Sequence, residues 1–316
     1  MLYARLAWAT FAVMLFARPV WAEDSPAFTR VEDVIYARKY GTALTLDVFA
    51  PKQTNGAGIV FVVSGGWFSA HEAIKAEVFQ EFLRRGYTVF TVVHGSQPKY
   101  TIPEILEDMH RAVRFVRYRA KDYRIDPERI GIAGGSAGGH LSLMIATAGR
   151  KGDPDAKDPV DRESSRVQAV GCYFPPTDFL NYGEPGRDVF KALEAELGPF
   201  RAPFDFVQFD PKSGRFQPVT DEAERRRIAR EISPVTHVTP DDPPTLLIHG
   251  DADKLVPIQQ AQIMQKSLEE AKVPVKVVVK PGAGHGWPDW IQDMATIADW
   301  FDAQLKDPGA ASTHPS

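Results

Sequence analysis

The stretch that most constrains the fold runs from Arg129 to Leu143 and reads RIGIAGGSAGGHLSL. An apolar run enters a cluster of glycines around one serine, and a segment rich in Ala, Leu and Met leaves it. This order predicts a strand, a very tight turn and a helix, with Gly134-x-Ser136-x-Gly138 at the turn. Small neighbours permit the strained backbone that a serine needs there, and its hydroxyl then points out of the strand end. The stretch predicts a nucleophilic serine, and the alternative is a glycine-rich turn that only lets a helix pack closely on a sheet.

The composition sets wide limits on the fold and narrower limits on partners. The chain has 316 residues, 44% of them hydrophobic and 25% charged, with a formal net charge of −4. This length and apolar content suit one large α/β domain, or at most two domains. The mild acidity gives no support to nucleic-acid binding. Cys172 is the only cysteine, so an intrachain disulfide is excluded and stability must come from packing.

The sequence contains no short motif for a nucleotide or a metal ion. The glycines at 131–139 do not fit the GxGxxG pattern, and no GxxxxGK motif followed by Ser or Thr occurs. Histidines outside the motifs described below show no metal-ligand spacing with partners. We therefore expect neither a metal nor an organic cofactor.

Residues 1–22 have the plan of a signal peptide. Arg5 precedes a short apolar run from Leu6 to Phe16, and Val20-Trp21-Ala22 then offers a cleavage point, with a small residue at its last position and an acceptable one two before it. The alternative is a membrane anchor, but a spanning helix needs about 20 apolar residues and this run is shorter. We expect cleavage after Ala22, a periplasmic or secreted protein, and no stable membrane insertion of the mature chain.

Strands and helices alternate along residues 23–305, and this order predicts a mostly parallel sheet covered by helices on both faces. Val31–Tyr40 and Thr42–Phe49 are predicted to form an antiparallel pair around Gly41. Helices are predicted over 72–85, from Thr101 onward and over 258–271. The remaining strands are predicted at 59–63, 87–93, 130–133, 167–174, 245–250 and 275–280.

One insertion, at about 181–232, interrupts this alternation between two predicted strands. It would sit at the edge of the sheet where the strands end, and there it would form a cap over the site. Its phenylalanines either line an acyl or aryl pocket or, as we favour, mostly build the cap's own small core. They stand at positions 190, 200, 204, 206, 209 and 216. Residues 306–316 are small or turn-forming and are predicted to be a flexible tail.

A serine hydroxyl needs a base to take its proton, and that base needs an acid to orient it. Asp251 and Asp253 follow the strand TLLIHG, and His285 follows the strand VKVVVK between two glycines. Ser136, an aspartate and His285 thus occur in the chain order of α/β-hydrolases. Spacing alone does not choose between the two aspartates.

With these motifs the chain resembles serine esterases of the α/β-hydrolase fold, in the hormone-sensitive-lipase-like and acetyl- or feruloyl-esterase-like branch. The resemblance covers nearly the whole mature chain and implies that fold. In the family the acid is the second aspartate of the HGDxD pattern, which implies Asp253 and leaves Asp251 to stabilise the turn. The motifs that carry the resemblance are SGGW (64–67), GGSAGGH (134–140), HGDADKLVP (249–257) and GAGHGW (282–287).

The resemblance also implies an oxyanion hole made of backbone N–H groups. One donor is Ala137, the residue after the nucleophile. The family's HGGGW loop corresponds to 63–67, so Gly65 and Gly66 match its donor glycines. Val63 replaces the family's histidine and Ser64 its first glycine. Because the donors belong to the main chain, catalysis is expected to survive these changes, which put the loop's support and the pocket wall in doubt.

The resemblance implies a carboxylic-ester hydrolase that works through an acyl-enzyme, and the signal-peptide plan implies that it is exported. Its substrate would be a small to medium ester, free or linked to a polysaccharide, with acetyl and feruloyl esters as candidates. A serine peptidase or amidase on the same fold is the first alternative. A non-catalytic ligand-binding member of the fold is the second, although such proteins usually lose one of the three residues. The sequence leaves the ester, the role of the cap and the oligomeric state undetermined.

Overall fold

The computed structural model describes residues 28–195 and 198–306. The predicted signal peptide and almost all of the predicted tail lie outside these residues. No helix in the described part of the chain is long and apolar enough to span a bilayer.

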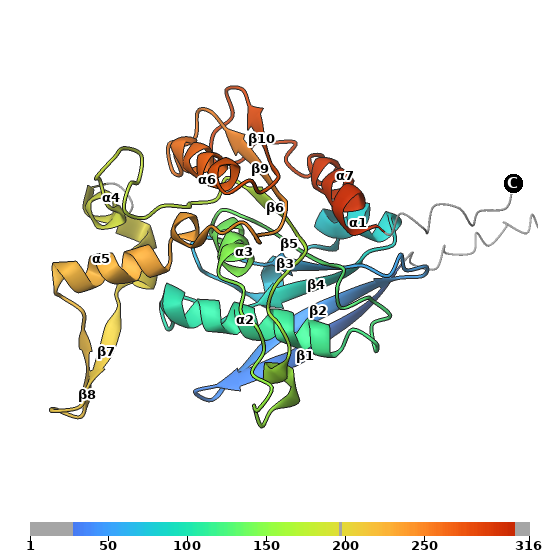
Figure 1. The fold of residues 1–316 in the computed structure, drawn as a ribbon, viewed down its shortest axis with the longest axis horizontal. Coiled ribbons are helices and arrows are strands. Elements are labelled where there is room, and N and C mark those ends of the chain that lie inside the picture. The colour runs from blue at the N-terminus through green and yellow to red at the C-terminus, as the bar shows by residue number, and fades with distance from the viewer. Residues whose placement is uncertain (1–27, 196–197, 307–316) are drawn as a thin grey trace, which may run out of the picture.

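An eight-stranded sheet forms the centre of the molecule, in the order β1-β2-β4-β3-β5-β6-β9-β10 (Figure 1). β1 pairs with β2 and β2 with β4 in antiparallel fashion, and every later pair is parallel. The predicted α/β-hydrolase architecture, with its antiparallel first pair, is therefore confirmed. The strands are β1 (Phe28–Lys39), β2 (Thr42–Pro51), β3 (Gly58–Val62), β4 (Thr88–Val93), β5 (Ile130–Gly135), β6 (Ala169–Tyr173), β9 (Thr245–Gly250) and β10 (Val275–Lys280).

Side chains of the central strands feed two hydrophobic cores, one on each face of the sheet. Along β3, Val60 and Val62 join the core under α2 and α3, whereas Ile59 and Phe61 face the core under α1 and α7. Successive residues of a strand point to opposite faces, so a strand buried on both sides is apolar throughout. The helices of this body are α1 (Gln80–Arg84), α2 (Ile102–Tyr118), α3 (Ala137–Thr147), α6 (Gln259–Glu270) and α7 (Met294–Leu305).

The structure corrects the helix predicted over 72–85. Two 3₁₀ turns, η1 (His71–Ala73) and η2 (Ala76–Phe79), precede the short helix α1. Between the turns Ile74 is extended, with φ −74° and ψ 115°, and its side chain is buried in the same core as Phe79. Burial of this side chain against the sheet overrides the local helical preference.

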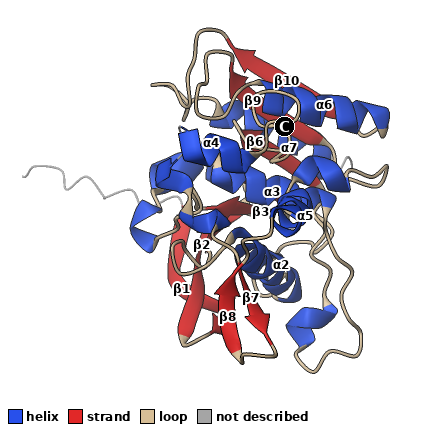
Figure 2. Ribbon diagram, turned by 90° about the vertical axis from the view of Figure 1, so that its left-hand side faces the viewer, coloured by secondary structure: helices blue, strands red, loops and turns tan. Residues whose placement is uncertain are grey.

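The insertion at 181–232 gathers at one end of the molecule (Figures 1 and 2). It contains α4 (Val189–Ala195), the short turns η4 (Gly198–Phe200) and η5 (Ala202–Phe204), the hairpin β7 (Val207–Asp210) with β8 (Arg215–Pro218), and α5 (Glu222–Glu231). Three of its phenylalanines, at 190, 204 and 206, are buried against one another. The two on the hairpin, at 209 and 216, are exposed. The insertion's phenylalanines therefore form a small core of three rings and an exposed pair on the hairpin, and Phe200 belongs to neither group.

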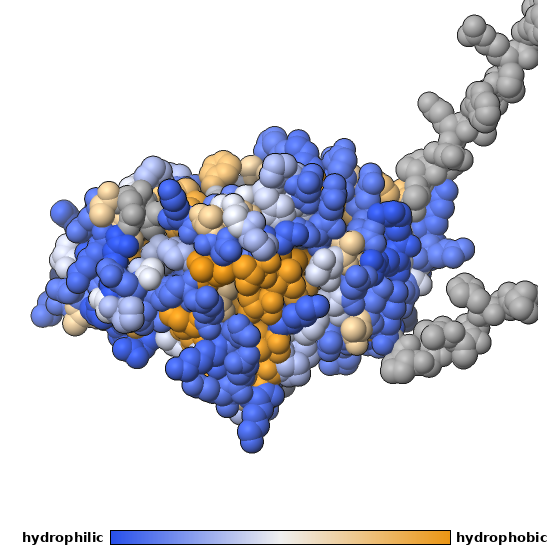
Figure 3. Space-filling view, turned by 90° about the horizontal axis from the view of Figure 1, so that it is seen from above, coloured by the Kyte–Doolittle hydropathy of each residue, from blue (hydrophilic) through white to orange (hydrophobic). Residues whose placement is uncertain are grey.

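The sheet ends at β10, and no strand of the described residues pairs with its outer edge. Seen from the side of the molecule on which β10 lies in Figure 1, the surface carries a hydrophobic patch near its centre (Figure 3). Val279 of β10 is 45% exposed, and Val275 and Val277 are half-buried. Lys276 interrupts this apolar strand and Lys280 ends it, and lysines on edge strands discourage pairing with other chains.

Candidate active site

The structure brings Ser136, Asp253 and His285 together from three loops at the same edge of the sheet. The Ser136 hydroxyl donates to Nε2 of His285 at 2.9 Å, and Nδ1 of His285 donates to Oδ2 of Asp253 at 2.7 Å. The aspartate fixes the tautomer, because an Nδ1–H directed at it leaves Nε2 free to accept the serine proton. Ser136 lies 149 positions from His285, and Asp253 lies 32 positions from it. The three side chains nevertheless form one continuous line of hydrogen bonds.

Ser136 sits in the turn between β5 and α3 in a conformation that side chains rarely adopt, with φ 54° and ψ −120°. The turn is as tight as the glycine pattern predicts. A Cβ on Gly134 would lie 2.6 Å from the carbonyl oxygen of Gly138, and one on Gly138 would lie 2.7 Å from the carbonyl oxygen of Val62. Glycine is needed at both positions because each obstacle is backbone that cannot rotate away.

The carboxylate of Asp253 is buried, and every group near it favours its charged form. Oδ1 accepts from the amides of Leu255 and Val256 at 2.9 Å each, and Oδ2 faces His285 and, at 3.5 Å, Nε2 of His249. Burial by itself raises the pKa of this carboxyl, but the hydrogen bonds from both histidines and from Val256 outweigh burial and hold the pKa below its usual range. Asp253 is therefore ionised at neutral pH.

Asp251 makes a different contact from Asp253. Its side chain is exposed, and Oδ1 accepts from the amide of Gly282 at 2.6 Å. The bond ties the turn after β9 to the loop that carries His285. The choice of the second aspartate, which rested on resemblance, thus agrees with the geometry of both carboxylates.

The structure corrects the predicted role of Gly65 as an oxyanion donor. Its N–H already donates to the carbonyl of Phe68 at 3.0 Å, closing a tight turn with the reciprocal bond from Phe68. The N–H of Gly66 has no acceptor among the described residues. Ala137 is the first residue of α3, so its N–H has no intrahelical acceptor. Gly66 and Ala137 are thus the two amides next to Ser136 that are open to a ligand.

Two buried histidines, neither of which was predicted to do so, support the 64–67 loop. Nε1 of Trp67 donates to Nδ1 of His140 at 3.2 Å, and Nε2 of His140 donates to the carbonyl of Ile232 at 2.7 Å. The Ser64 hydroxyl donates to Nε2 of His94 at 2.8 Å. Burial lowers the pKa of each histidine to about 4, so both are neutral.

The sequence does hold a signal for His94. It directly follows β4, the strand beside β3 in the sheet, and β3 leads into the 64–67 loop. In parallel strands the carboxyl ends meet at one edge, so a polar residue at that point lies near the loop. The Ser64–His94 pair supports the loop at the position where the family's own histidine and glycine are replaced.

An apolar pocket opens beside Ser136. It is lined by Gly66 from the 64–67 loop and by side chains of both the body and the insertion. Its free volume is about 30 Å³. The principal apolar walls are Trp67, Phe179, Val189, Leu193, Phe200 and Leu255.

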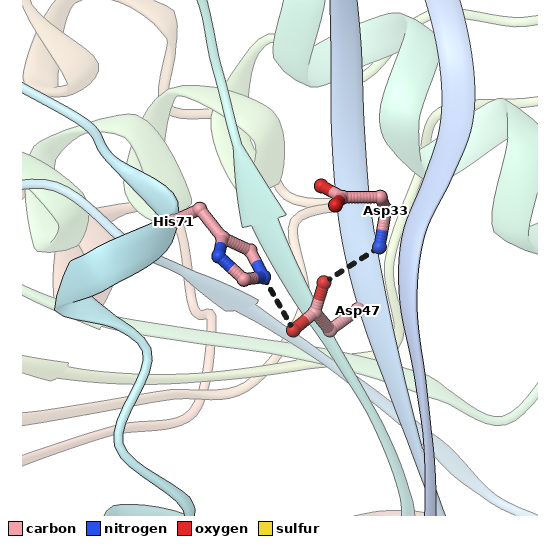
Figure 4. Close-up of side chains that lie close together, drawn as sticks. All are labelled: Asp33, Asp47 and His71. Atoms are coloured by element: carbon pink, nitrogen blue, oxygen red, sulfur yellow. Dashed lines mark hydrogen bonds and ion pairs between the residues drawn. The ribbon is translucent and has the colours of Figure 1, made fainter.

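Among the described residues one group of side chains has the spacing of a metal site, and it lies on β1, β2 and η1. Asp33, Asp47 and His71 place one ligand atom each within 4.8 Å of one another (Figure 4). However, Oδ2 of Asp47 accepts from Arg30 at 2.8 Å and lies 3.2 Å from Nε2 of His71, and Oδ1 accepts from the amide of Asp33. The guanidinium compensates the buried carboxylate, so a cation would have to displace it.

A serine, an aspartate and a histidine that follow one another in this chain order, and that hydrogen bonds join at this edge of the sheet, have the arrangement of an α/β-hydrolase site. Residues 46–268 match the profile of the BD-FAE family, and the chain belongs to that family. The predicted resemblance to esterases of the α/β-hydrolase fold is thereby confirmed.

The chain is also similar to individual proteins. A probable carboxylic ester hydrolase of Mycobacterium tuberculosis, LipM, is 29% identical over 263 residues, which cover 81% of this chain and 56% of LipM. A truncated carbohydrate esterase from gut microbiota superimposes with a TM-score of 0.69 at 26% identity, covering 90% of this chain and 99% of that one. An acetyl ester-xyloside bifunctional hydrolase from Caldicellulosiruptor lactoaceticus gives 0.68 at 24% identity, with 86% and 95% covered, and shows the shared fold. The chain spans about half the length of the curated relatives it matches.

Proposed function

We propose that this protein is a carboxylic-ester hydrolase in which Ser136 is the nucleophile, His285 the general base and Asp253 the orienting acid. The observation that carries the proposal is the unbroken hydrogen-bonded line from the serine hydroxyl to the buried carboxylate, beside two open amides. The names of similar proteins support the same reaction class, since they include a carboxylic ester hydrolase and a carbohydrate esterase.

The reaction follows from the positions of these groups. His285 takes the proton of Ser136 as the serine oxygen attacks the ester carbonyl, and the N–H groups of Gly66 and Ala137 stabilise the negative oxygen that develops. His285 then protonates the leaving alcohol, and the C–O bond breaks to leave an acyl-serine. Water, deprotonated by the same histidine, attacks the acyl carbon. The bond between that carbon and the serine oxygen then breaks, His285 returns the proton to Ser136, and the acid is released. Each proton that leaves Ser136 or water passes through Nε2 of His285.

The first test is hydrolysis of p-nitrophenyl esters from acetyl to dodecanoyl, with p-nitroanilides of the same acids as controls. We expect release of p-nitrophenol from the esters and no release of p-nitroaniline from the anilides, because an anilide is a far poorer acyl donor. Cleavage of the anilides at comparable rates would favour a peptidase or amidase. No release from any compound would contradict the proposal and favour a non-catalytic ligand-binding protein.

We also propose export to the periplasm or the medium, on the signal-peptide plan of residues 1–22. In a Gram-negative host the full chain is expected to yield an exported protein whose first residue is Glu23. N-terminal sequencing of the periplasmic fraction measures this directly. Exported protein that still begins with Met1 would contradict cleavage and favour an anchor.

A further inference from the structure

The pocket beside Ser136 lies on the side of the nucleophile that receives the acyl group. The leaving alcohol must lie against Nε2 of His285, because that atom delivers its proton. His285 does not line the pocket. Ser136 does, and so does Gly66, the residue that carries one of the two open amides. A carbonyl bound between Ser136 and Gly66, with its alcohol toward His285, therefore directs its acyl chain into the pocket.

The size of the pocket limits that chain. Its free volume is about 30 Å³. A space this narrow, walled by apolar side chains, favours a short acyl group such as acetyl or propionyl over a bulky aryl group such as feruloyl. The lining is almost wholly apolar, which suits a short alkyl chain.

Phe200 is the wall that sets this size. Its ring packs edge-on against Gly66, where a Cβ would lie 2.7 Å from Cδ1 and 2.8 Å from Cε1 of the ring. Its neighbours in the wall are held by other rings: Phe204 contacts Trp67 and Phe179, with ring centroids 5.2 Å apart in each pair.

Phe200 also differs in exposure from the other aromatic residues that line the pocket. Phe200 is only half-buried, whereas Phe179 is fully buried and Phe204 is 4% exposed. Removal of a fully buried ring leaves a gap in the core, but removal of the Phe200 ring opens the pocket outward to solvent. A longer chain then gains room without a change in the packed core.

We propose that Phe200 is the residue that limits acyl-chain length, and that the protein hydrolyses esters of short acyl groups, acetyl above all. The inference rests on the proposed ester hydrolysis and adds its acyl specificity. Phe200 acts by filling space next to the oxyanion-binding amide of Gly66, and the main chain of the site stays as it is.

The test compares kcat/KM for p-nitrophenyl acetate, butyrate and octanoate in the wild type and in Phe200→Ala. The wild type is expected to prefer acetate. Because one methylene in a fitted pocket is worth about 10-fold or more, Phe200→Ala is expected to raise the octanoate-to-acetate ratio at least about tenfold. Phe200→Leu is expected to give an intermediate ratio, and it serves as the test if the alanine variant has a lowered melting temperature.

The matched control is Phe216→Ala, the same substitution in the same insertion on a ring that is 72% exposed and lies on the hairpin. Its ratio is expected to equal that of the wild type. An active wild type that prefers octanoate, or a ratio that neither Phe200 variant changes, overturns the inference and leaves ester hydrolysis standing. A wild type inert toward every ester overturns the proposed function itself, and the inference falls with it.

Discussion

Ser136→Ala is expected to lower kcat for ester hydrolysis by about 10⁶-fold, to the level of binding and oxyanion stabilisation alone. The alanine keeps the Cβ that the turn already accommodates, so the fold and the two open amides should persist. The measurement is steady-state release of p-nitrophenol, with the melting temperature as a check of folding. Ser213→Ala, on the exposed turn of the hairpin, is the matched control and should be fully active.

The three residues should also behave as one unit. His285→Ala is expected to cost about as much as Ser136→Ala, and the double variant no more than either single one, because each change already breaks the same proton path. Substantial turnover by Ser136→Ala would mean that another group attacks the ester. Additive losses in the double variant would mean that serine and histidine act independently.

Asp253→Asn is expected to lower kcat by about 10⁴-fold, because an amide at this position favours the wrong tautomer of His285. Nδ1 would then accept from the new amide, and Nε2 would carry a proton that blocks transfer from Ser136. The same change at Asp251 should cost less than about tenfold, since Asp251 only accepts a bond from the Gly282 amide. The comparison uses kcat at constant pH with saturating p-nitrophenyl acetate.

The pair of asparagine variants tests the choice of acid directly. If Asp251→Asn lost more activity than Asp253→Asn, the assigned acid would be wrong in spite of its 2.7 Å contact with His285. Equal losses would indicate that both aspartates act by positioning the loop that carries His285.

Local sequence was enough to predict the chemistry where a backbone rule fixes the geometry. Gly134-x-Ser136-x-Gly138 between a strand and a helix predicts a tight turn that exposes the serine, and strands whose carboxyl ends share an edge bring the loops after β5, β9 and β10 together. Ser136 and His285 follow from that logic. The choice of Asp253 over Asp251 did not, because both leave the same strand and only burial and partners separate them.

The features that the sequence did not predict depend on contacts between distant segments. Ile74 adopts an extended conformation instead of a helical one because its side chain is buried in the core, and no local sequence pattern indicates this burial. Gly65 matched the family's donor glycine, yet its N–H closes a turn with Phe68. Phe200 looked like the insertion's other phenylalanines, and only its place against Gly66 gives it a separate task.

The backbone at Ser136 has a consequence for engineering. A residue with a side chain held at positive φ costs the folded state about 1–3 kcal/mol, and glycine would avoid most of that cost. Ser136, which the proposed reaction needs most, thus lowers the stability of the folded state. A library of variants selected for heat resistance alone would be drawn toward glycine at 136, and its best survivors would be inert, so any such selection must include turnover as a second criterion.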